Sequence, residues 1–126
     1  MTWEDIRYLH FEKENAPIFN KSFILFAFFL QKGKVQYMLH YKITVKGCVQ
    51  GVFYRASTKE EALKLGLKGY VRNLPNGDVL IEAEGDKEQL DKLVNWCHTG
   101  PPLSEVTEVL TTEGDVIGFS LFEIRK

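Results

Sequence analysis

The chain has 126 residues, the length of one ordinary domain, and its 44% hydrophobic and 26% charged residues are typical of a globular protein. The formal net charge of -1 argues against nucleic-acid binding through a broad basic surface. Two cysteines, Cys48 and Cys97, are too few for a secreted disulfide framework. The three histidines lack zinc-site spacing, so we expect surface or partly buried side chains at His10, His40 and His98.

The first 37 residues differ from the rest of the chain. Their apolar run FILFAFFL, residues 23–30, is far shorter than the roughly 20 residues of a membrane helix, so we expect no membrane span. The chain begins with acidic residues such as Glu4 and Asp5 and shows no small-residue cleavage site, which predicts a cytoplasmic protein. We interpret residues 1–37 as an N-terminal extension, or as an upstream translated stretch, because Met38 comes just before a clear strand.

A regular pattern begins at Met38. The stretch YKITVKG, residues 41–47, alternates apolar and polar side chains and predicts a half-buried strand. The loop GCVQGVFYR, residues 47–55, follows it. A helix is predicted over 55–67, because Ala, Glu, Lys and Leu favour helix and Gly66 can help to end it.

The next stretch, GYVRNLPNGDVLIEAEG, predicts a hairpin. Strands 69–74 and 78–84 flank the turn signal Asn76-Gly77. A second helix follows, with Asp86 as N-cap and Gln89 three residues later, as in a capping box. Its apolar face is formed by Leu90, Leu93, Val94 and Cys97.

After the helix-breaking GPP at 100–102, segments 105–112 and 118–125 are predicted to be strands. The order βαββαβ with an extra C-terminal strand predicts a ferredoxin-like α+β sandwich. In this fold two helices cover one face of a mostly antiparallel sheet. The same fold hosts enzymes, RNA binders and regulatory modules, so it leaves the function open.

The glycine loop is a candidate anion site, although a tight turn followed by a solvated arginine explains it equally well. Successive N–H groups in such a loop can form a nest beside the positive end of the following helix. Arg55 at the helix start is unfavourable to the helix dipole, and a bound anion would offset that cost. Asn73 ends a strand before the turn, where its amide can orient a water or simply bend the backbone.

The neighbours of these residues have plainer interpretations. Strand alternation directs Arg72 to the face opposite Asn73, where we expect a solvated charge. Phe53 and Tyr54 are expected to pack in the core or the loop. Cys48 has no histidine near it in sequence that would activate its thiol.

Together, the two stretches resemble the two signature motifs of the acylphosphatase family. The matching residues of the first motif are Gly47, Val49, Gln50, Gly51, Val52, Tyr54 and Arg55. Those of the second are Gly69, Tyr70, Val71, Arg72, Asn73, Gly77, Val79 and Gly85. The resemblance covers about residues 40–126 and implies an acylphosphatase-like domain over 38–126. The front segment departs from the family's small enzymes.

The resemblance implies hydrolysis of the carboxyl–phosphate bond of small-molecule acyl phosphates, with inorganic phosphate as a product. By this analogy Arg55 binds the phosphate and Asn73 orients the attacking water. The loop amides that would cradle the phosphate belong to Val49, Gln50, Gly51, Val52, Phe53 and Tyr54. The carboxylate leaving group needs no general acid, so positioning and charge stabilisation suffice. We expect no metal or other cofactor, and a monomer.

Two other function classes fit parts of the pattern. A regulatory module that binds phosphate or an acyl phosphate would use the same loop without turnover. An RNA-binding ferredoxin-like module would carry exposed aromatic residues on its central strands, and neither YKITVKG nor DVLIEAEG supplies them.

Overall fold

The computed structural model describes residues 37–126, so the predictions made for residues 1–36 lie outside the described part. The elements in chain order are β1 (Leu39–Cys48), α3 (Tyr54–Lys64), β2 (Lys68–Asn73), β3 (Val79–Gly85), α4 (Lys87–Thr99), β4 (Glu105–Gly114) and β5 (Phe122–Arg125). This is the predicted ferredoxin-like βαββαβ order with an extra strand. None of the described helices is long and apolar enough to cross a membrane.

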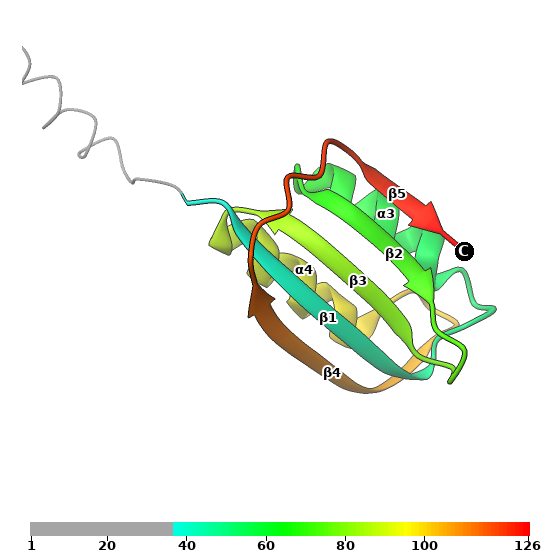
Figure 1. The fold of residues 1–126 in the computed structure, drawn as a ribbon. Helices are drawn as coiled ribbons and strands as arrows, with labels where there is room; N and C mark the ends of the chain where they lie inside the picture. The colour runs from blue at the N-terminus through cyan, green and yellow to red at the C-terminus, as the bar shows by residue number, and fades with distance from the viewer. Residues whose placement is uncertain (1–36) are drawn as a thin grey trace, which may run out of the picture. The chain divides into compact units, whose positions relative to one another are not determined.

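The five strands form one sheet in the order β4-β1-β3-β2-β5. All neighbours are antiparallel except the parallel pair β2 and β5. Both helices cover the same face of the sheet (Figure 1). Because β1 and β2 are each antiparallel to β3, the strands β1, β2 and β5 all run in one direction. Their carboxyl ends therefore lie at the same end of the sheet, beside the start of α3 (Figure 1).

The core lies between the sheet and the two helices. Alternate residues of β1, such as Ile43 and Val45, are fully buried, as the strand pattern predicted. From α4, the predicted face contributes the buried side chains Leu90, Leu93 and Cys97, and the partly buried Val94 packs against them. The predicted N-cap is confirmed, since the carboxylate of Asp86 accepts the backbone N–H of Gln89 at 2.9 Å.

Three predicted boundaries are corrected. Helix α3 ends at Lys64, before Gly66, which has a φ of +72°. Strand β4 extends two residues beyond the predicted end, to Gly114. Strand β5 begins at Phe122 instead of residue 118. The connection 115–121, called the strap below, has no strand structure, because three of its backbone N–H groups donate to the carboxylate of Glu84 in β3.

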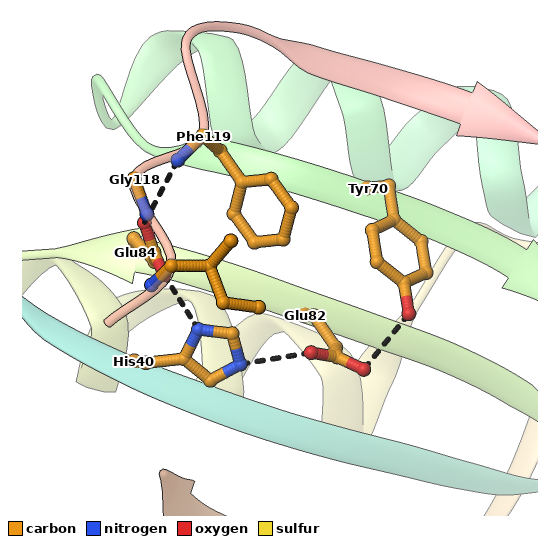
Figure 2. A network of polar contacts seen from close by, with 7 residues as sticks. His40, Tyr70, Glu82, Glu84, Gly118 and Phe119 are labelled. Carbon is orange, nitrogen blue, oxygen red and sulfur yellow. Dashed lines mark hydrogen bonds and ion pairs between the residues drawn. The ribbon is translucent and has the colours of Figure 1, made fainter. Parts of the chain in front are cut away.

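A polar cluster lies on the sheet face opposite the helices (Figure 2). His40 is only 4% exposed, so the expectation of a surface or partly buried histidine is wrong here. Its Nδ1 lies 2.7 Å from Glu84 and its Nε2 lies 2.9 Å from Glu82. The Tyr70 hydroxyl donates to the other oxygen of Glu82 at 2.8 Å. The imidazole of His40 thus bridges two carboxylates of β3.

The strap covers the side of this cluster that faces away from the sheet. The carboxylate of Glu84 accepts the backbone N–H groups of residues 117–119 at distances of 2.5, 2.9 and 3.1 Å. The Phe119 ring stacks on His40 and meets the Tyr70 ring edge-on (Figure 2). Burial alone would raise the pKa of Glu84, but the donors from His40 and the strap together lower it to about 2.

Candidate active site

The end of β1 and the loop that leads to α3 contain three residues with positive φ values. Gly47 has a φ of +128°, and a Cβ there would lie 2.2 Å from the carbonyl oxygen of Glu105, so only glycine fits. Gly51 and Phe53 also have positive φ values, of 77° and 67°. Left-handed residues are typical of loops whose successive N–H groups converge on an anion, so these φ values support the predicted nest.

The start of α3 is left without a side-chain cap. Its N-cap residue, Phe53, offers no side-chain acceptor, and the first turn contains no acidic residue. In contrast, α4 is capped by the carboxylate of Asp86 and carries Glu88 in its first turn. The first N–H groups of α3 therefore lack an acceptor that their own helix could supply, and this end of the helix favours an anion.

A pocket of about 300 Å³ opens between the loop, the start of α3 and the ends of β2 and β5. Its lining residues are Val49, Gly51, Phe53, Tyr54, Arg55, Ala56, Asn73 and Ile124. The structure thus brings the two predicted catalytic residues, Arg55 and Asn73, to one pocket. Two predicted loop residues, Gln50 and Val52, do not line it; Val52 packs against the core instead.

Arg55 is held at the pocket by the C-terminal strand. Its Nη1 donates to the main-chain carbonyl of Arg125 at 3.3 Å. The side chain of Arg125 is occupied elsewhere, because it pairs with Glu123 at 2.8 Å and lies 4.1 Å from the centre of the Tyr70 ring. Arg125 therefore contacts Arg55 through its main-chain carbonyl and not through its side chain. No sequence pattern indicated this contact, since the partner is a backbone atom 70 residues away.

Gln50 ties the loop to the β2–β3 hairpin. Its Nε2 donates to the carbonyl oxygens of Leu74 and Asp78, both at 2.8 Å. Asn73, the last residue of β2, directly precedes Leu74. The side chain of Gln50 therefore fixes the distance between the loop and Asn73, a role that the sequence did not reveal.

Asp78 braces the same hairpin. This largely buried residue accepts from the Lys46 ammonium at 2.7 Å, and its own N–H donates to the side chain of Asn76 at 3.0 Å. Its carbonyl also accepts the N–H of Leu74 at 2.8 Å. The predicted turn at Asn76-Gly77 is thus present, with Gly77 at a φ of +99°.

The two aromatic residues before Arg55 behave differently. Tyr54 is 1% exposed and donates its hydroxyl to the carbonyl of Cys97 at 2.7 Å, which confirms it as a core residue and links α3 to α4. Burial raises the pKa of Tyr54 well above its ordinary value. The packing expected for Phe53 is wrong: this side chain is 73% exposed, because its left-handed backbone turns it away from the core to the pocket.

The remaining candidates lie apart from the pocket lining. Both cysteines are free, with Cys48 exposed and Cys97 buried. Arg72 is half-buried on the outer face of the sheet and does not line the pocket. Within residues 37–126, no three His, Cys, Asp or Glu side chains are grouped so that they could hold a metal ion.

Comparison with known proteins points to one family. A family model described as Acylphosphatase matches residues 41–124. An acylphosphatase of Methylococcus capsulatus is 53% identical over 76 residues, which cover 60% of this chain and 83% of that protein. One of Acaryochloris marina is 49% identical over 83 residues, or 66% and 89% of the two chains. The crystal structure of acylphosphatase from Bacillus subtilis matches with a TM-score of 0.69 and 39% identity, covering 70% of this chain and 99% of that one.

Proposed function

The chain belongs to the acylphosphatase family and hydrolyses acyl phosphates, and from this premise we propose that the reaction takes place in the pocket shared by Arg55 and Asn73. In this proposal Arg55 and the loop amides bind the phosphate, and Asn73 orients water. The observation that supports it most is the placement of both side chains at one pocket, beside a helix start without a cap.

The substrate phosphate enters with its oxygens toward the loop. The guanidinium of Arg55 pairs with two phosphate oxygens, and the N–H groups of residues 49–54 bind the others. The positive end of α3 adds a fixed favourable potential. Because these groups are held in place before the substrate arrives, they stabilise the charge of the transition state without reorganisation.

The chemistry is an in-line displacement at phosphorus. The side-chain oxygen of Asn73 accepts a hydrogen bond from water while its NH₂ donates to a phosphate oxygen. The water oxygen forms a bond to phosphorus as the bond from phosphorus to the acyl oxygen breaks. The carboxylate leaves with that electron pair, and the water's proton passes to a phosphate oxygen. The products are a carboxylate and dihydrogen phosphate, and no protein acid is needed because carboxylates are weak bases.

We also propose the setting in which the site works. The two free cysteines fit a reducing compartment, in keeping with the cytoplasm. The acylphosphatase-like domain spans residues 38–126, and residues 1–37 are an extension to it.

The test is release of phosphate from acetyl and benzoyl phosphate, measured with and without an excess of chelator. We expect equal turnover in both conditions, since Arg55 and the amides supply the positive charge that a metal would otherwise provide. Turnover that the chelator abolishes and added divalent metal restores would contradict the proposed route.

A further inference from the structure

Phe53 has a backbone conformation that its residue type disfavours. Its φ of 67° and ψ of 20° place it in the left-handed region. Among residues 37–126 it is the one residue other than glycine with a positive φ. A bulky aromatic residue in this region is an outlier, whereas Gly or Asn adopts it with little strain. Such strain is retained where the side chain is used.

Packing does not account for the ring. Phe53 is 73% exposed and is neither a core residue nor one of the partly buried residues packed against the core. Four other aromatic side chains of the described domain pack in pairs, Tyr54 on Trp96 and Tyr70 on Phe119, and Phe53 joins no such pair. The fold therefore gains little from an aromatic residue at this position.

Phe53 supplies exposed apolar surface to the lining of the active-site pocket. Among the lining residues, two large apolar side chains are substantially exposed: Phe53 at 73% and Ile124 at 42%. The polar lining residues are Arg55 and Asn73, which take the phosphate and the water. An acyl phosphate has the same two-part character, with a charged phosphate joined to a carbon body. When the phosphate is bound at Arg55, the carbon body can contact the exposed apolar lining residues.

We propose that Phe53 is a specificity-determining residue that binds the acyl group and favours acyl phosphates with an aromatic or extended apolar body. This inference rests on the proposed function of the pocket. The contact is remote from the reacting phosphorus, so it stabilises the bound substrate and the transition state alike. Its effect should therefore be seen in KM more than in kcat.

The test compares KM and kcat for acetyl and benzoyl phosphate in the full-length chain and its variants. The parental protein should have the lower KM for benzoyl phosphate. In Phe53→Asn, which suits the left-handed backbone, the preference in kcat/KM for benzoyl over acetyl phosphate should fall about five- to tenfold, the size of an aromatic pair. Phe53→Tyr, which keeps a ring, should retain the preference. Leu63→Ala, which removes another exposed apolar side chain outside this pocket, is the control and should leave KM and kcat for both substrates unchanged.

A second readout separates specificity from structure. Relief of strain should leave the melting temperature of Phe53→Asn at or above the parental value. A parental protein without preference, or equal losses on both substrates, would overturn the inference. So would a Phe53→Asn variant whose phosphate inhibition constant rises with both KM values, because the cradle itself would then be disturbed. The parental protein is measured before the variants. If it hydrolyses neither substrate, the proposed function itself is wrong.

Discussion

Gln50 does not line the pocket, yet its side-chain amide helps to position the residues that do. Its two hydrogen bonds reach main-chain carbonyls of the β2–β3 hairpin, on either side of the turn that follows Asn73. The loop that would hold the phosphate and the residue that would hold the water are thereby kept in register. A displacement of about 1 Å between such groups commonly costs about a hundredfold in rate.

We therefore expect Gln50→Ala to lower kcat by about ten- to a hundredfold. The inhibition constant of inorganic phosphate should change much less, because Arg55 and the backbone N–H groups remain. Steady-state kinetics with benzoyl phosphate would measure both values. Asn95→Ala removes an exposed amide of α4 and should have no effect on either. A Gln50→Ala variant with parental kcat would show that the hairpin holds Asn73 unaided.

At the residue scale, the sequence predicted the site residues that belong to short local motifs. Arg55 and Asn73 were predicted from two short stretches, and the structure brings them to one pocket. The partners that position them were not predictable. The carbonyl of Arg125 lies 70 residues from Arg55, and the carbonyl of Leu74 lies 24 residues from Gln50. Any residue type has a carbonyl, so only the folded chain identifies these acceptors.

At the scale of elements, the carboxylate of Glu84 holds the strap against β3. Strand alternation places Glu82 and Glu84 on the face of β3 opposite the helices, yet Glu84 is 1% exposed. Its burial comes from the strap, whose three N–H groups it accepts (Figure 2). Residues 118–121 of the strap were predicted to belong to the last strand. The competing hydrogen bonds to Glu84 were not visible in the sequence.

This arrangement predicts a specific acid sensitivity. The pKa of Glu84 is lowered to about 2 in the folded chain, below its ordinary value of 4.5, so its contribution to stability is complete above pH 4.5. That contribution is lost as the pH falls from 4.5 to about 2. Glu84→Gln should unfold more easily at pH 7, by up to about 3 kcal/mol, because the neutral amide loses the charge-assisted hydrogen bonds that Glu84 makes with His40 and the strap. The difference from the parental protein should shrink toward pH 2.

Urea unfolding at pH 7, 4 and 2.5 would check this prediction. Glu60→Gln, an exposed substitution on α3, should stay within about 0.5 kcal/mol of the parental protein at each pH. Some acid sensitivity should persist in Glu84→Gln, because hydrogen bonds from Lys87 and Tyr41 lower the pKa of Asp91 as well. A difference between Glu84→Gln and the parental protein that does not vary with pH would show that the charge of Glu84 is unimportant.

At the scale of the whole molecule, the fold was predictable because local signals agree with one another. Alternating strands, a glycine turn, an N-cap and an amphipathic α4 all indicated the same βαββαβ order, and the structure has it. The sheet order follows from this topology. The same direction of β1, β2 and β5 then explains why Arg55 and Asn73, 18 residues apart, lie at the same end of the sheet (Figure 1).

The domain boundary leads to a prediction for a shortened chain. Every helix and strand of the described domain lies between Leu39 and Arg125, as do all residues that line the pocket. A chain that begins at Met38 should therefore fold and keep the turnover of the full-length protein. Circular dichroism and phosphate release would be compared for the two chains. A short chain that is unfolded or inactive would show that residues 1–37 complete the domain.

The central claim is that Arg55 binds the phosphate while Asn73 acts on the water. The most direct test is the inhibition constant of inorganic phosphate, measured together with kcat for Arg55→Ala, Asn73→Ala and the neighbouring control Arg72→Ala. Arg55→Ala should weaken phosphate inhibition and lower kcat together. Asn73→Ala should lower kcat by about 10²–10³ while phosphate inhibition stays nearly intact. Arg72→Ala, on the outer face of the sheet, should change neither. Equal loss of phosphate inhibition in Arg55→Ala and Asn73→Ala, or near-parental kcat in both, would contradict this account.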